Sequence, residues 1–396
     1  MKMLNGIVRG LEALHNRREQ KEKEIIFIAE NIKPRIVKIG YALKKKNCKV
    51  VLFLKKKNKM ELKKAQKNFS DKIYFFGEKE DLYIKCLAFS PMVYHIFAEA
   101  NVPEWAEYLL QKKSILGKIV YDQYDIYRGF VRDTLDEIAK REKYCLENAD
   151  GLCCRMFETQ YLKHKYRYRF QGKRILFLDY CWNTSSSQSV IEKRGNGLRF
   201  VYGGRLLSAY AFSDRYRIER NGFEYIAKTL QQRQAYFVII TSHLCEGSGY
   251  SAYRALQKKY SHVLLKEPMS YKRLIWYESH MDYGIDCVEL EEDIAAFYKK
   301  KNTFNMKAKN RYYATNKFFD YLDAGIMPIY GRKGELFGRY LSSFGGAVWC
   351  SLEEMGDKLK ELKEKCEENK KKARRAREAF AIENQIDRLI AFYQEI

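Results

Sequence analysis

The sequence predicts an α/β protein built from two Rossmann-like domains in tandem, and three observations predict it. At 396 residues, the chain is longer than one ordinary hydrophobic core requires. Apolar runs of strand length alternate with amphipathic helical stretches through both halves. Between the halves lies CWNTSSSQSVIEKRGNG (181–197), a polar, Ser-rich stretch punctuated by glycine, which is typical of a linker.

The first half begins with a buried strand at 24–30, EIIFIAE, followed by a helix that Pro34 opens. A second strand, CKVVLFLKKK, precedes the stretch ELKKAQKNF, which places Leu62, Ala65 and Phe69 on one helical face and lysines on the other. Three more strands are expected in KIYFFG, MVYHIFAEA and GKIVYDQYD. This alternation is typical of a doubly wound parallel sheet.

The second half repeats the pattern. Strands are expected in LRFVYGGRL, AYFVIITSH, SHVLLKE, MDYGIDCV and GGAVWC, and helices in GFEYIAKTLQQR, in YSAYRALQKKY and from Tyr271 onward. A charged helical tail follows from Leu352. We therefore predict an N-terminal domain at 1–180, a linker at 181–197, a second domain at 198–350 and a helical tail at 351–396.

The chain is strongly basic, with a formal charge of +24. Residues 1–175 hold 38 Lys and Arg against 22 Asp and Glu, and Lys44–Lys67 holds eleven lysines with one acid. Such a positive field attracts negatively charged partners. Three kinds are candidates: nucleic acid, an anionic lipid surface and phosphorylated ligands. A solvated Lys-rich surface without a specific partner is the other interpretation.

The cysteines and apolar runs exclude several classes of protein. Ten cysteines form no C-x-x-C motif, which argues against a zinc knuckle, a redox centre and a disulfide framework and favours a reducing cytoplasm. The start MKMLNGIVRGLEALHNRREQKEK lacks the apolar core of a signal peptide, and no apolar run approaches the length of a membrane span. We expect a cytoplasmic protein.

The segment TNKFFDYLDAGIMPIYG, Thr315–Gly331, carries the strongest functional signal. On a helix beginning near Asn316, Lys317 and Asp320 share one face while Phe318 and Leu322 lie on the opposite, buried side. The backbone N–H groups at the helix start and the Lys317 ammonium would attract an anion, and Asp320 would accept hydrogen bonds from a ribose. The alternative is an amphipathic helix with a glycine cap and no ligand.

The stretch NKFFDYLDAGIMPI (316–329) resembles the donor-site signature of GT-B glycosyltransferases, in the retaining glycosyltransferase family 4, also called group 1. RFVYGGRL resembles the glycine loop and phosphate-binding Arg of that family's second domain, NGFEYIAKTL its following helix, and EPMSYKRLIWYESHMDYGID its base-binding loop and next strand. In the first half, KIVYDQYD and ADGLCCRMFETQYLKHKY resemble late strands of the acceptor domain. The resemblance implies a GT-B fold, in which two Rossmann-like domains face a central cleft and C-terminal helices cross back to the first domain.

The resemblance also implies a set of site residues. Catalytic roles would fall to Arg205, Lys317 and His95; donor binding to Gly203, Gly204, Arg220, Asn316 and Asp320; and base binding to the loop of Lys266, Glu267, Pro268 and Met269. The cations would stabilise the charge of a departing nucleoside diphosphate, and no D-x-D motif for a metal occurs, so neither a metal nor another cofactor is expected. Two positions depart from the family: Tyr312 replaces a carboxylate that touches the donor sugar, and Arg220 is the nearest substitute for a missing Lys.

His95, expected just after a strand, either faces the donor sugar or has a structural role. If transfer inverts the configuration, Glu99 or Asp122 is the candidate base, although Asp122 and Asp125 are equally typical of loop caps.

These features favour a metal-independent, retaining glycosyltransferase that moves a sugar from a nucleotide-sugar donor to a surface polysaccharide or glycan. The acceptor would be lipid-linked and reached from the cytoplasmic face. The basic first domain would bind anionic lipid, making the protein peripheral to the membrane. The alternatives are a catalytically silent GT-B-like partner subunit and a basic nucleic-acid-binding protein. No nucleic-acid-binding signature supports the latter, and no G-x-G-x-x-G supports a dinucleotide-dependent oxidoreductase.

Overall fold

The computed structural model describes residues 2–15, 19, 21–55, 69–99, 101–130, 135–155, 157–182, 197–204, 222–241, 248–286, 308, 311–312, 314–332 and 334–396. The chain divides into two compact units. One consists of Met1–Asp179 together with Ile382–Ile396, and the other of Tyr180–Ala381. The chain therefore passes from the first unit to the second after Asp179 and returns after Ala381. Most of the predicted linker, 183–196, and most of the predicted helix at 61–69 lie outside the described residues.

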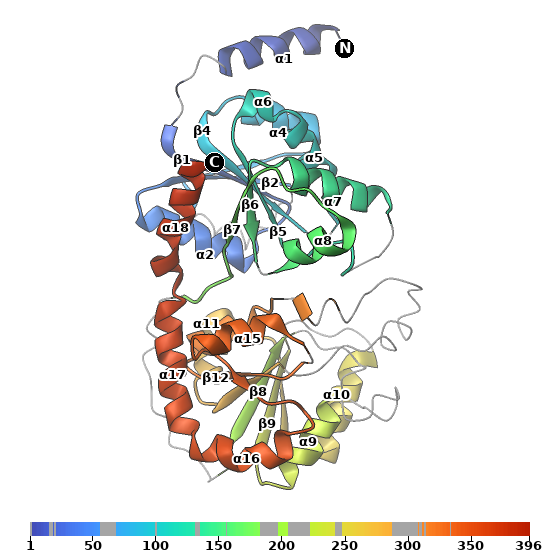
Figure 1. The fold of residues 1–396 in the computed structure, drawn as a ribbon, viewed down its shortest axis with the longest axis vertical. Helices are drawn as coiled ribbons and strands as arrows, with labels where there is room; N and C mark the ends of the chain where they lie inside the picture. Colours follow the sequence, from blue (N-terminus) through green and yellow to red (C-terminus); the bar gives the residue numbers. More distant parts are fainter. Residues whose placement is uncertain are drawn as a thin grey trace. The chain divides into compact units, whose positions relative to one another are not determined.

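The first unit is built on a parallel sheet of seven strands in the order β3-β2-β1-β4-β5-β6-β7 (Figure 1). The strands are β1 (Lys21–Ala29), β2 (Lys49–Leu54), β3 (Lys72–Phe75), β4 (Pro91–Ala98), β5 (Ile119–Gln123), β6 (Gly151–Cys154) and β7 (Lys173–Leu176). In register, Ile26 of β1 pairs with Val51 of β2 and with Tyr94 of β4. Residues 25–28 of β1 are wholly buried, as expected for a central strand that is covered on both faces.

Helices alternate with these strands. They are α1 (Lys2–His15), α2 (Pro34–Lys45), α4 (Lys79–Cys86), α5 (Glu104–Gln111), α6 (Lys113–Leu116), α7 (Glu137–Asn148) and α8 (Glu158–Tyr166). The first turns of two of them follow from ordinary helix-start chemistry, and the start of α2 at Pro34 was predicted. Pro34 occupies the first turn of α2, and the Asp136 side chain accepts a hydrogen bond from the Ala139 backbone N–H at the start of α7.

The second unit contains a parallel sheet of six strands in the order β10-β9-β8-β11-β12-β13. The strands are β8 (Arg199–Gly204), β9 (Tyr236–Thr241), β10 (Val263–Lys266), β11 (Tyr283–Ile285), β12 (Met327–Tyr330) and β13 (Val348–Trp349). The helices are α9 (Phe223–Gln231), α10 (Ser248–Lys259), α11 (Tyr271–Glu278), α14 (Lys317–Asp323), α15 (Leu336–Ser343), α16 (Met355–Glu364) and α17 (Cys366–Ala379). Both units therefore have the predicted α/β, Rossmann-like organisation.

The predicted tail divides between the two units. Helices α16 and α17 belong to the second unit, while α18 (Ile382–Glu395) belongs to the first and packs on α2 (Figure 1). Buried Ile386, Leu389 and Tyr393 form its inner face. Of the helices in the predicted tail, α18 is the one that returns to the first unit.

Each sheet reverses its strand order at one point, between β1 and β4 in the first unit and between β8 and β11 in the second. Loops on the two sides of such a point leave in opposite directions and open a crevice at the carboxyl ends of the strands, where ligands of open α/β sheets bind. A ligand-binding site is therefore expected at each of these two crevices. No helix in the described part of the chain combines the length and apolar character needed to cross a bilayer.

Candidate functional site

The crevice of the second unit begins with the two glycines that end β8. A Cβ on Gly204 would lie 2.5 Å from Cε of Lys317, so the glycine leaves room for this lysine to cross the end of the strand. The Lys317 ammonium lies 4.9 Å from the centre of the Tyr202 ring, a cation–π contact. The structure thus brings together the glycine loop and the lysine, more than a hundred residues apart, that the sequence analysis assigned to one site.

Helix α14 has the two faces that its sequence predicts. Phe318 and Leu322 are wholly buried, whereas the side chain of Lys317 is 21% exposed and Asp320 is half-buried. The Asn316 carbonyl accepts from the backbone N–H groups of Phe319 and Asp320 at 3.0 and 3.2 Å. The polar face of α14 lies at the carboxyl edge of the sheet, because Lys317 reaches Gly204 at the end of β8.

An ion cluster lies beside Lys317. Asp286 follows β11 directly and is buried, and its Oδ1 lies 3.3 Å from Nζ of Lys317 and 2.5 Å from Nη2 of Arg332. Burial alone would raise the pKa of Asp286, but Arg332 and Lys317 outweigh it and hold this pKa below its ordinary value. Asp286 is therefore ionised and binds both cations at neutral pH.

Glu335 completes this cluster. It is wholly buried, and its Oε1 lies 4.0 Å from Nη1 of Arg332. Neither of its carboxyl oxygens has a hydrogen-bond partner among the described residues. Burial raises the pKa of Glu335 to about 8 despite the nearby Arg332. Near neutral pH this carboxyl is therefore mostly protonated.

Sequence reasoning missed Asp286, Arg332 and Glu335. The available signal was positional, because Asp286 follows β11 directly and Arg332 comes two residues after β12. Charged side chains just beyond the carboxyl ends of neighbouring parallel strands meet at one edge.

The other glycine of β8, Gly203, contacts different side chains. The Gly203 N–H donates to the Tyr321 hydroxyl at 3.1 Å, and that hydroxyl donates to the Ile285 carbonyl at 3.2 Å. A Cβ on Gly203 would lie 2.6 Å from Oε1 of Glu278. Burial, with repulsion from Asp320 and Asp323, raises the pKa of Glu278 well above its ordinary value. Gly203 thus fits between a tyrosine hydroxyl and a buried acid.

Asp320, the expected ribose ligand, accepts a hydrogen bond from the Tyr271 hydroxyl at 3.1 Å. The same hydroxyl lies 2.8 Å from Oδ2 of Asp323. Tyr271 opens α11, directly after the expected base-binding loop, so α11 and α14 are linked at this edge. Within the loop, Lys266 ends β10 and its ammonium lies 5.7 Å from the Tyr277 ring, Glu267 is exposed, and Pro268 and Met269 are half-buried.

Two expected cations, Arg205 and Arg220, lie outside the described residues. Tyr312, at the position of the family's second carboxylate, is half-buried with the Arg311 guanidinium 5.6 Å from its ring centre.

His95 requires a correction of position. It lies within β4 rather than after it, its side chain has no exposed surface, and its ring stacks on Phe97 at 4.2 Å between centroids. Its Nδ1 lies 2.6 Å from the Tyr393 hydroxyl of α18, and its Nε2 lies 3.4 Å from Oδ2 of Asp122. Burial lowers the pKa of His95, despite Asp122. A substrate cannot touch a side chain without exposed surface, so the structure gives His95 a packing role.

Asp122 is equally buried and is paired with Arg35 at 2.8 Å, which argues against its acting as a base on a substrate. His95, Asp122 and Cys153 have ligand atoms within 4.8 Å of one another, a spacing that fits a metal ion. However, the Arg35 guanidinium contacts both Asp122 and Cys153, and a fixed cation opposes a second one in a buried place. We interpret this cluster as the polar core beneath α18.

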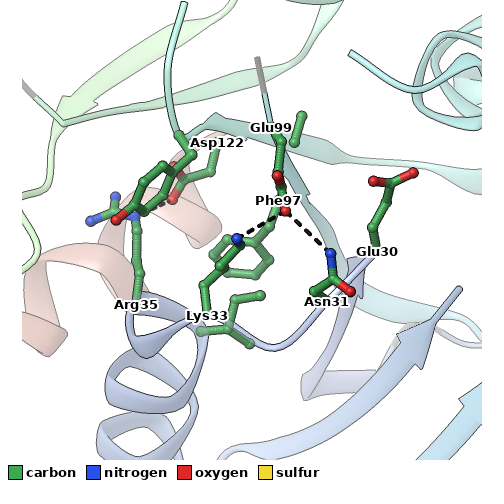
Figure 2. Close-up of a pocket in the computed structure, with 10 residues that line it drawn as sticks. Glu30, Asn31, Lys33, Arg35, Phe97, Glu99 and Asp122 are labelled. Carbon is green, nitrogen blue, oxygen red and sulfur yellow. Dashed lines mark hydrogen bonds and ion pairs between the residues drawn. The ribbon is translucent and has the colours of Figure 1, made fainter. Parts of the chain in front are cut away.

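At the crevice of the first unit, Glu99 is accessible. A small pocket of about 20 Å³, on the order of one water molecule, lies at the carboxyl ends of β1 and β4. Figure 2 shows Asn31 and Lys33 pointing at Glu99, whose Oε1 they approach at 3.3 and 3.1 Å. The Glu99 side chain is 38% exposed, so of the two candidate bases it is the one that a substrate can reach.

Two Rossmann-like units, together with the return of the last helix to the first, define the GT-B fold, and comparison with solved structures agrees. HepE from Anabaena, solved in complex with UDP-glucose, matches with a TM-score of 0.61 and 12% identity over 93% of this chain and 98% of its own. An alpha,alpha-trehalose-phosphate synthase (UDP-forming) from Burkholderia vietnamiensis matches with a TM-score of 0.56 and 7% identity over 95% and 99%.

A Listeria monocytogenes protein proposed to be a UDP-N-acetylglucosamine 2-epimerase matches with a TM-score of 0.54 and 9% identity over 93% and 95% of the two chains. Likeness at such low identity shows the fold, and this fold carries more than one chemistry. Neither a scan against protein-family models nor a search of curated protein sequences returns a match. The activity must therefore be argued from the site.

Proposed function

We propose that this protein is a glycosyltransferase that uses a nucleotide-sugar donor. The observation that carries the proposal is the approach of Lys317 to Gly204 at the carboxyl edge of the second sheet. There the backbone of β8 and a lysine ammonium border the crevice in which an open α/β sheet binds a nucleotide. Breaking the bond between sugar and diphosphate leaves extra negative charge on the diphosphate, which a fixed cation stabilises more in the transition state than in the ground state.

Asp320 supports a nucleotide over a simple phosphorylated sugar. A carboxylate that is half-buried and oriented by Tyr271 can accept the two hydroxyls of a ribose. HepE is solved with UDP-glucose and the Burkholderia vietnamiensis protein is UDP-forming. A uridine nucleotide is therefore the first donor to test.

We propose that transfer needs no metal ion and retains the anomeric configuration. A lysine at the diphosphate supplies the positive charge that a divalent ion supplies in other enzymes. Retention follows from the family that the segment 316–329 resembles, although Tyr312 departs from its pattern. Inversion would require a base, and Glu99 is the accessible candidate in the first unit.

We further propose a lipid-linked acceptor on a growing surface polysaccharide or capsule-like glycan, met at the cytoplasmic face of the membrane. The support is the basic first half of the chain, since each Lys or Arg near an anionic bilayer contributes about 1 kcal/mol. Sedimentation with anionic and with neutral liposomes tests this part separately. Equal binding to both kinds, or binding that persists at high salt, would remove the membrane from the proposal.

A thermal-shift screen with UDP, GDP and ADP, followed by mass spectrometry of sugar transfer or slow hydrolysis across matching sugar nucleotides, tests the activity. One nucleoside diphosphate should stabilise the protein with and without EDTA, and Lys317→Ala should abolish the shift. Lys258→Ala, at an exposed position in the last turn of α10, is the matched control.

Nucleotide binding without sugar transfer would favour a catalytically silent GT-B-like subunit. The Tyr312 substitution is the observation that supports this alternative. Indifference to every nucleotide, with tight RNA binding, would favour a nucleic-acid-binding protein.

A further inference from the structure

In the crevice of the second unit, two cationic side chains contact the same carboxylate oxygen. Oδ1 of Asp286 lies 3.3 Å from the Lys317 ammonium and 2.5 Å from the Arg332 guanidinium. Because both nitrogens touch the same atom, they are separated by no more than the sum of these distances, about 6 Å. Two phosphates of a diphosphate can meet two cations at that separation.

The strands place Arg332 at the same crevice as Lys317. Strand β12 neighbours β11, and Asp286 directly follows β11. Arg332 comes two residues after β12, and the intervening Gly331 leaves no room for a side chain, since a Cβ there would lie 2.3 Å from the Cys350 carbonyl oxygen. This close contact with the end of β13 fixes the backbone just before Arg332.

Arg332 also suits a phosphate chemically. Its guanidinium presents N–H donors in a planar fork that matches the oxygens of a phosphate, and Nη2 contacts Asp286. The side chain is 9% exposed, so most of its conformational entropy is already lost in the folded protein and little more is lost when it binds a ligand.

We propose that Arg332 is a second phosphate-binding side chain of the donor site, with Asp286 as the positioning residue that holds Arg332 and Lys317 beside each other. This inference rests on the proposed function, because it concerns the diphosphate of the same donor. Arg332 contacts the phosphate farther from the nucleoside or shares it with Lys317, while Asp286 acts through the two cations and does not touch the ligand.

The test measures affinity by calorimetry for a series of probes that differ only in phosphate number: uridine, UMP and UDP, or the matching series for the base that the wild type prefers. Arg332→Gln should weaken UDP binding 10- to 100-fold, weaken UMP binding less and leave uridine binding unchanged. Arg332→Lys, which keeps the charge but loses the fork, should fall between Gln and wild type. Arg339→Gln, an exposed arginine on α15, should match the wild type for all three probes.

Asp286 is tested by a double-mutant cycle. Asp286→Asn alone should weaken UDP binding, but in the Arg332→Gln background the same change should cost clearly less, because one of the two side chains that Asp286 positions is then absent. Full additivity of the two losses would refute the positioning role.

The outcomes separate the two proposals. A wild-type protein that binds no nucleoside diphosphate overturns the proposed function. If the wild type binds UDP and Lys317→Ala abolishes binding, while Arg332→Gln binds UDP as tightly as wild type, the proposed function stands and the role of Arg332 is refuted. Equal losses of uridine and UDP in both Arg332 variants would also refute it, because they indicate a structural role.

Discussion

Replacing Glu335 with glutamine should change how the stability of the second unit depends on pH. Burial raises the pKa of Glu335 to about 8, against 4.5 for an exposed glutamate. Between these values the folded state holds a proton that the unfolded state has released, so the free energy of unfolding falls as pH rises. Below pH 4.5 both states are protonated, and above pH 8 both are ionised, so the loss is confined to this window.

The size of the effect follows from the two pKa values. Proton linkage gives a slope of about 1.4 kcal/mol per pH unit inside the window, flattening near pH 8. From pH 6 to pH 8 this group alone should lower the free energy of unfolding by about 2 kcal/mol. No screening by solvent reduces the figure, because Glu335 is wholly buried. Glu335→Gln keeps the shape of the protonated acid without titrating, so the variant should lack this loss.

Urea denaturation at pH 6, 7 and 8 measures the difference. Three of the four tryptophans, Trp182, Trp276 and Trp349, lie in the second unit, so intrinsic fluorescence reports mainly on its unfolding. Glu361→Gln is the control: hydrogen bonding and charge pairing with Lys365 lower the pKa of Glu361, so it does not titrate in this range. Parallel pH profiles for wild type and Glu335→Gln would refute the assignment of a buried, protonated acid beside Arg332.

Three further substitutions test the packing around the two sites, each by the urea midpoint. Gly284→Ala should destabilise the second unit by about 1–3 kcal/mol, because the new Cβ would lie 2.2 Å from ring atoms of Tyr321; an unchanged midpoint would show that the ring moves freely. Tyr393→Phe should cost about 1–3 kcal/mol, since it leaves the buried Nδ1 of His95 without the hydroxyl 2.6 Å away; a neutral result would mean that α18 does not depend on this bond. Arg35→Met should cost about 3–5 kcal/mol by leaving two buried aspartates without this counter-charge, and a variant as stable as wild type would contradict the ion-pair interpretation.

Local patterns in the sequence were sufficient for the repeating architecture and for one part of the site. Strand-sized apolar runs and helical periodicity depend on neighbours in the chain, so both Rossmann-like halves could be predicted from them. The same holds for α14, whose buried Phe318 and Leu322 and outward Lys317 follow from helical spacing.

Only the tertiary structure decided which distant residues meet. The Arg332 guanidinium contacts a carboxylate oxygen of Asp286 because β11 and β12 are neighbours in the sheet. Which strands are neighbours depends on the strand order of the sheet, which no local sequence pattern encodes. His95 was expected just after a strand, yet it lies inside β4 beside Tyr393, because the last helix of the chain returns to cover it. Burial and partners are set by the whole fold, since they depend on segments hundreds of residues away, whereas helix and strand periodicity is set by the adjacent residues.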